Sequence, residues 1–279
     1  MTLKSAILHT APTSYWPLDD PSGSTWVRDA CGLHDGLPSA SGVDLAAVPF
    51  GAARVPHFDG NLGSGVVIPN DGRYSHDHAD ALTVACWAAP NVLDFPHTSG
   101  LTDQYVHLVE KSADYTHDVE WAFRLYNATN PCRHSRLSFY LFNLGHPTLK
   151  GAGAYMEFGR SRNDDWAVRP GRWVFLVGQG EGWIDGTDTT RGAMFFKQGA
   201  KADRSPGDKY NADQWNVRPR HGPGAITLGG SPGKTAFRGA LGHVALWNRL
   251  LTCCEVAEVF SAGMAELAGF PEVAVSPRA

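Results

Sequence analysis

The sequence predicts an all-β domain in which two antiparallel sheets form a sandwich. Hydrophobic residues make up 43% of the 279 residues and charged residues 19%, and 31 Gly and 18 Pro can supply turns. Short alternating or wholly apolar segments recur and are separated by Gly, Pro, Asn and Asp, which is typical of a sandwich. Because such folds often exceed roughly 200 residues as one domain, we expect one domain over residues 1–270 and a loosely held tail over 271–279.

The individual strands and helices follow from local patterns. The candidate strands are residues 14–20, 63–69, 81–90, 105–111, 120–127, 136–143, 172–178, 225–230 and 239–248. Asp185-Gly186 is the residue pair that a tight hairpin prefers. Thr252 and Glu255 have capping-box spacing before Val256, Val259, Phe260 and Leu267, which predicts a short C-terminal helix across the sandwich. A second turn of helix is expected at 3–9, and long rim loops at 91–103, 145–170 and 187–224.

An ordered set of motifs then resembles a known family. Y-W-P-L-D-D (15–20), D-A-C-G-L-H-D-G (29–36), F-D-G (58–60), W-I-D-G (183–186) and F-R-G-A-L-G-H-V-A-L-W-N-R-L-L (237–251) occur in the family's order. They are similar to the laminin-G-like, or pentraxin-like, branch of the concanavalin A-like lectin and glucanase superfamily, in its bacterial or phage type. The resemblance implies a jelly-roll sandwich. It leaves the activity open, because this fold hosts lectins, adhesion modules, glucanases and lyases.

Charge and composition restrict the partners and the cellular setting. The net charge of −4 gives no basic stripe for nucleic acid, and no apolar run is long enough for a membrane span. The first residues lack signal-peptide features, so the localisation stays open between a virion or particle, non-classical export and a trimmed secreted domain. The five cysteines show no C-x-x-C spacing and are expected to be free thiols.

The catalytic patterns of related enzymes are missing from the sequence. The family's glucanases carry an E-x-D-x-x-E strand, whereas here Asp114, Asp118 and Glu120 form only a loose acidic group, expected to be solvated. Gln104 and His107 are three residues apart, so strand alternation predicts that they point to opposite faces, unlike the Q-x-H strand of alginate lyases. No G-x-S-x-G elbow is present. These observations favour a binding protein over an enzyme and name no catalytic residue.

The resemblance also implies a calcium site in the N-terminal loops. Asp29, Asp35 and Asp59 lie at the family-like loop positions and offer the oxygen ligands that Ca²⁺ prefers. The last strand, Gly239 to Val244, lacks the acidic pair that often completes such a site. We therefore expect a weakened or lost Ca²⁺ site and no required cofactor.

A glycan site needs aromatic rings together with planar polar groups. Alternation sends Trp121, Phe123 and Leu125 to the core and leaves His107, Arg124, Tyr126 and Tyr140 on one shallow outward face. Trp166 and Trp215, in the long loops, are the other candidate contacts.

The leading hypothesis is therefore a carbohydrate-binding or adhesion module whose partner is a glycan or polysaccharide. Two alternatives remain: a polysaccharide hydrolase or lyase with a variant active site, and a structural or decoration protein of a phage or cell-surface particle. The last would act through self-association or contacts in a larger assembly.

Overall fold

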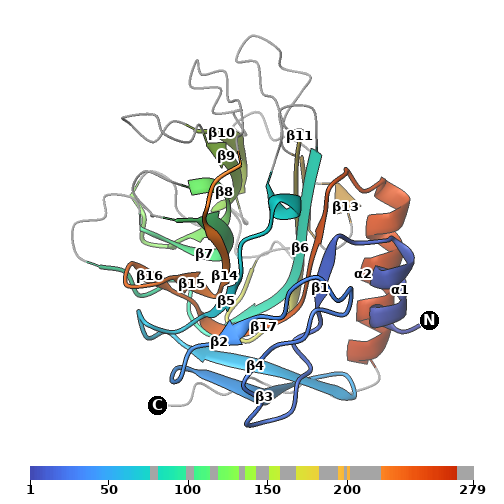
Figure 1. The fold of residues 1–279 in the computed structure, drawn as a ribbon, viewed down its shortest axis with the longest axis horizontal. Coiled ribbons are helices and arrows are strands. Elements are labelled where there is room, and N and C mark those ends of the chain that lie inside the picture. The colour runs from blue at the N-terminus through green and yellow to red at the C-terminus, as the bar shows by residue number, and fades with distance from the viewer. Residues whose placement is uncertain are drawn as a thin grey trace.

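The protein is a β-sandwich, as the sequence predicts, with both helices on one side of it (Figure 1). The computed structural model describes residues 1–75, 81–98, 104–113, 119–131, 136–142, 151–157, 168–181, 194–197, 200–201 and 221–268. All strand pairs in its sheets are antiparallel, so the two-sheet antiparallel architecture is confirmed.

An eight-stranded sheet forms one layer of the sandwich. Its order is β13 (Ala200–Lys201), β12 (Met194–Lys197), β11 (Val174–Glu181), β6 (Ala81–Pro90), β17 (Arg238–Trp247), β4 (Ala53–Asp59) and β3 (Val43–Phe50). Strand β1 (Ser14–Trp16) also pairs with β17, over Val244 to Leu246. The register between β17 and β6 shifts between Gly242 and Ala245.

A seven-stranded sheet forms the second layer. Its order is β10 (Gly151–Glu157), β9 (Arg136–Phe142), β8 (Val119–Tyr126), β7 (Tyr105–Ser112), β14 (Ala225–Leu228), β5 (Val66–Ile68) and β2 (Leu37–Pro38). The short strands β15 (Gly230–Ser231) and β16 (Thr235–Ala236) pair beside β7, and a 3₁₀ turn, η1 (Gly72–Tyr74), follows β5.

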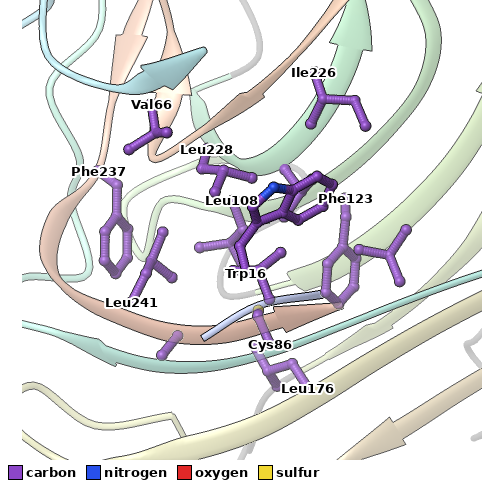
Figure 2. Close-up of a cluster of buried hydrophobic side chains, with 14 of the residues drawn as sticks. Trp16, Val66, Cys86, Leu108, Phe123, Leu176, Ile226, Leu228, Phe237 and Leu241 are labelled. Atoms are coloured by element: carbon purple, nitrogen blue, oxygen red, sulfur yellow. The ribbon is translucent and has the colours of Figure 1, made fainter. Parts of the chain in front are cut away.

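The main core lies between the two sheets, because alternate residues of facing strands point inward. Cys86 and Leu176 come from the eight-stranded sheet, whereas Leu108, Phe123 and Ile226 come from the seven-stranded sheet (Figure 2). The free thiol of Cys86 is buried here, as the sequence predicts, whereas Cys31, Cys253 and Cys254 are exposed.

Both helices cover the side of the eight-stranded sheet that points away from the main core, and a second apolar cluster forms there. Helix α1 (Leu3–His9) matches the expected turn at 3–9, and α2 (Cys253–Ala268) is longer than the short helix expected. The predicted capping box is present: Glu255 N donates to Thr252 Oγ1 at 3.2 Å, and Thr252 N donates to a Glu255 carboxylate oxygen at 2.8 Å. The sequence patterns therefore located central strands of both layers and the helical cover, but they missed β3, β4, β10 and β12.

Several sequence predictions fall partly or wholly outside the described residues. They are the hairpin at Asp185-Gly186, the tail 271–279 and most of the loops 145–170 and 187–224. The described parts of these two loops contain β10, β12 and β13, so the prediction of loops throughout these stretches is wrong. Residues 91–98 of the loop 91–103 are described and form no helix or named strand. In the part of the chain that is described, neither helix combines the length and apolarity needed to cross a bilayer.

Candidate functional site

The candidate site is the face of the seven-stranded sheet that points away from the main core, which we call the outer face. Leu108, Trp121 and Phe123 of β7 and β8 pack into the core. Their neighbours in sequence point the other way, and the register aligns His107 with Arg124 and Arg124 with Ser138. The predicted grouping of His107, Arg124, Tyr126 and Tyr140 on one face thus agrees with the strand register.

The guanidinium of Arg124 lies among four aromatic rings, a group that we call the Arg124 cluster. Its Cζ atom is 4.6 to 5.7 Å from the ring centroids of Tyr105, Tyr126, Tyr140 and Phe142. Arg124 Nε also donates a hydrogen bond of 3.0 Å to Ser138 Oγ. Because an arginine both stacks on rings and donates from a planar fork, the cluster joins apolar and hydrogen-bonding surface at one place.

A β-bulge brings a carboxyl group beside this cluster. The register between β7 and β8 shifts between His107 and Val109, so both Leu108 and Val109 point into the core. As a result Glu110 lies on the outer face with His107, and His107 Nδ1 is 3.3 Å from Glu110 Oε2. Glu110 Oε1 accepts a hydrogen bond of 3.2 Å from Thr227 Oγ1. Simple alternation over three residues would have separated His107 and Glu110.

Burial dominates the electrostatics of this pair. Desolvation raises the pKa of Glu110 to about 7, against the lowering effect of hydrogen bonds from Ser231 and Thr227 and of the charge on Arg124. Desolvation, reinforced by the charge of Arg124, holds the pKa of His107 well below its usual range. His107 is therefore neutral near pH 7, and Arg124 is the cation whose charge favours the ionised carboxyl group.

The Arg124 cluster differs in one respect from the shallow, open face that alternation suggests. Its five side chains expose between 3% and 9% of their surface, and His107 exposes 2%. Part of the reason is their own packing: Tyr140 stacks on Phe142, and Tyr105 contacts Tyr126 edge to face, with Arg124 against all four. The cluster is a packed floor rather than an open surface.

An exposed apolar strip on the same face was not anticipated from the sequence. Trp26, Leu37 and Val67 expose 46%, 58% and 38% of their surface. The bridge Val27–Gly36 places Trp26 opposite Leu37, and Leu37 pairs with Val67. We call these residues the Trp26 strip. The signal that could have revealed Trp26 is the alternation in T-W-V-R, where the buried Val27 lies between the exposed Trp26 and Arg28.

The strip and the cluster belong to one face of one sheet. A single transverse row of paired residues runs from the strip towards the cluster, through Leu37, Val67, Thr227, Glu110, Ala122 and Tyr140. With strands about 4.8 Å apart, the row from Leu37 to Tyr140 covers roughly 24 Å. Leu37 and Val67 at one end of this row are exposed, whereas Thr227, Glu110, Ala122 and Tyr140 are buried.

The three predicted calcium ligands take structural hydrogen bonds instead. The two oxygens of Asp29 accept from Ser14 Oγ and from the amides of Tyr15, Cys31, Leu33 and His34 at 2.8 to 3.3 Å. Asp35 Oδ1 accepts from Asp29 N and Asp59 Oδ1 from Asn61 N. Asp29 thus has no lone pair left for a cation and does not fit a calcium ion. Across the described ranges no group of three His, Cys, Asp or Glu could hold a metal, and calcium binding stays a prediction of the resemblance.

The remaining sequence candidates are placed only in part. Trp166 and Trp215 lie outside the described residues, as do Asp114 and Asp118. Glu120 was expected to be solvated, which is wrong. It is buried in an ion pair with Lys111, and its carboxylate also accepts from Gly222 N at 2.8 Å. The pair places opposite charges together inside the protein, and Lys111 Nζ donates to Gly222 O as well.

Comparisons with known proteins place the chain by its fold. No protein-family model matches the sequence, and no curated protein matches it either. Among solved structures, domain 4 of AbnA, a GH43 extracellular arabinanase from Geobacillus stearothermophilus in complex with arabinotriose, aligns with a TM-score of 0.55. Its identity is 15%, over 89% of this chain and 97% of that one.

Two further structures are similar. The botulinum neurotoxin serotype D ligand binding domain in complex with N-acetylneuraminic acid has a TM-score of 0.54 and 9% identity, over 93% of this chain and 52% of that one. Trypanosoma rangeli sialidase has a TM-score of 0.52 and 13% identity, over 90% of this chain and 33% of that one. The chain thus spans about half of the toxin domain and a third of the sialidase. At these identities the likeness shows a shared β-sandwich fold.

Proposed function

We propose that this chain is a carbohydrate-binding module that recognises a glycan on the outer face of its seven-stranded sheet. The observation that carries the proposal is the Arg124 cluster, in which a guanidinium, four aromatic rings and a neighbouring carboxyl group meet on one face. Aromatic rings stack on the apolar side of a sugar, and planar polar groups take its hydroxyls. Two structures of similar fold are complexes with arabinotriose and N-acetylneuraminic acid, which supports the same general class of ligand.

In this proposal His107, Arg124, Tyr126 and Tyr140 form the rigid floor of the site. Because these side chains are held by one another, they lose little conformational freedom on binding. Trp166 and Trp215, outside the described residues, remain the proposed contacts from the loops. We further propose, from the motif resemblance, that the chain is a distant laminin-G-like member of the concanavalin A-like superfamily.

Affinity electrophoresis over a panel of neutral and acidic polysaccharides tests the function. We expect the wild-type chain to be retarded by at least one polysaccharide. Arg124→Lys keeps the charge but removes the planar fork, so the affinity for that polysaccharide should fall about tenfold or more. Arg54→Lys on β4 of the other sheet is the matched control and should bind as wild type.

A second, milder variant guards against misfolding. Tyr140→Phe removes only the hydroxyl group, and near-UV circular dichroism would show whether the aromatic packing survives in both variants. Migration of the folded wild-type chain unchanged in every polysaccharide would contradict the proposed function. If the correctly folded Arg124→Lys protein binds with the same affinity as wild type, the Arg124 cluster is not part of the binding site.

One observation favours an enzyme as the second candidate. A buried carboxyl group with a pKa of about 7 is suited to act as a general acid or base, and Glu110 lies beside His107 and Arg124. In this alternative Glu110 would exchange a proton with a bound polysaccharide. Reducing-end and unsaturated-product assays over the same panel decide the question. Product formation by wild type that is abolished in Glu110→Gln would support an enzymatic function. If wild type forms no product from any polysaccharide in the panel, the enzymatic function is ruled out.

A further inference from the structure

The structure assigns a second contact point for the proposed ligand: we infer that the Trp26 strip binds a neutral pyranose of the same glycan. The inference rests on the proposed carbohydrate-binding function and names a place and a ligand class for it. The strip is accessible, since Trp26 and Leu37 expose about half of their surface while the Arg124 cluster is packed.

The strip is fixed in place before any ligand arrives. Val27 N donates to Gly36 O at 2.7 Å and Gly36 N donates back to Val27 O at 2.8 Å, which locks Trp26 opposite Leu37. Gly36 has no side chain here because a Cβ atom would lie 2.7 Å from Val66 Cγ1 in the core. The bonds to Asp29 described above hold the next turn of the chain. An aromatic ring on such a rigid frame costs little entropy to use.

The charges beside Trp26 indicate the kind of ligand. Arg28 and Asp35 are both exposed, and the same bridge register places them opposite each other, next to the Trp26–Leu37 pair. An arginine donates hydrogen bonds and a carboxylate accepts them. Opposite charges side by side give no net attraction for an anion, whereas a hydroxyl group can both donate and accept. A neutral sugar ring, apolar on one side and rich in hydroxyls at its edge, matches this arrangement.

Other occupants match it less well. A stable protein interface takes roughly 20 to 30 residues from each partner, and the strip offers three exposed apolar side chains. Strand addition at this edge is also poorly supported, because β2 has two residues and Val27 already pairs beside it. The transverse row through Val67, Thr227 and Glu110 places the strip and the Arg124 cluster on one sheet, although Thr227 and Glu110 are themselves buried.

The test compares exposed apolar residues on opposite sides of the protein. Trp26→Ala removes the ring, Trp26→Phe keeps an aromatic ring, and Leu8→Ala on α1, with 39% exposure, is the matched control. The probe is the neutral polysaccharide that retards the wild-type chain most strongly. We expect Trp26→Ala to weaken retention about tenfold or more, and Trp26→Phe and Leu8→Ala to retain most of the affinity. Raising the salt concentration should leave the retention unchanged, because the contact has no net charge.

The outcomes separate this inference from the proposed function. If a neutral polysaccharide retards wild type and Trp26→Ala equally, while Arg124→Lys is impaired, the strip is not part of the site and the function stands. Retention by acidic polysaccharides alone, weakened by salt, overturns the neutral ligand class. A wild-type dimer in light scattering that Trp26→Ala dissociates would assign the strip to a second copy of the chain. No retention of wild type by any polysaccharide removes the function and this inference together.

Discussion

Glu110 is the residue at which the folding of this sheet and its proposed chemistry meet. It is fully buried, it lies 3.3 Å from a neutral histidine, and the cation that acts on it, Arg124, also contacts four aromatic rings. A carboxyl group in such a place costs free energy when it ionises. The protein therefore keeps at this position a group that a purely apolar residue could replace with less electrostatic cost.

The free energy of unfolding should depend on pH through this residue. Its pKa is about 7 in the folded protein and 4.5 without perturbation. The folded-state pKa is the higher one, so the stabilising contribution is complete below pH 4.5 and is lost as the pH rises through 7. Glu110→Gln cannot ionise, and relative to wild type it should gain roughly 3 kcal/mol between pH 4 and pH 8. Urea unfolding of both proteins at pH 4 and pH 8 measures this difference. If the variant and wild type differ in unfolding free energy by the same amount at both pH values, Glu110 does not ionise in a buried position.

Among the elements, β7 and β8 together show what the sequence could and could not predict. Alternation correctly sorted Trp121, Phe123 and Leu125 from Arg124 and Tyr126, because both faces of β8 follow the simple period of two. It could not place Glu110, since the bulge at Leu108 depends on the partner strand. It also missed Trp26, because a single bridge is too short to give a recognisable strand pattern. Burial of the Arg124 cluster was equally out of reach, as it arises from contacts among three strands.

Helix α2 depends on one close approach to the eight-stranded sheet. At Gly263 the helix meets the indole of Trp87, and a Cβ atom there would lie 2.3 Å from Cζ2 of that ring. Trp87 is fully buried and also stacks on Phe175 at a ring separation of 5.2 Å. The indole therefore has little room to move away.

Gly263→Ala should for this reason destabilise the protein, although the same change inside a helix normally stabilises it by about 1 kcal/mol. Overpacking of the kind expected here costs roughly 1 to 3 kcal/mol. Ser261→Ala, at an exposed position of the same helix, is the control and should be neutral or slightly stabilising. Thermal unfolding by circular dichroism measures both. A Gly263→Ala protein at least as stable as wild type would show that α2 is not packed this closely.

At the scale of the whole molecule, we propose that residues 1–270 act as one folding unit. The main core draws residues from both sheets. The second apolar cluster packs the helices against the eight-stranded sheet. Trp16 and Trp121 belong to the first cluster and Trp87 and Trp247 to the second. The indole rings thus report on both layers of packing.

Unfolding in urea should accordingly be a single transition. We expect intrinsic tryptophan fluorescence, to which the four buried indoles contribute, and far-UV circular dichroism, which follows the strands and helices, to give the same midpoint. Separate midpoints would mean that the helices with the eight-stranded sheet unfold independently of the seven-stranded sheet. The chain would then consist of two folding units.

The position of β1 sets the order in which the chain can be completed. Tyr15 of β1 donates to or accepts from His243, 228 residues away, at 2.6 Å, and β1 finds its only sheet partner in β17 among the described strands. At synthesis rates of about 5 to 20 residues per second, the ribosome needs roughly ten seconds or more to deliver that partner. Until then the first strand lacks its native sheet partner and can make contacts such as those with Asp29 and Ala30, so we expect the N-terminal end to join the sandwich last.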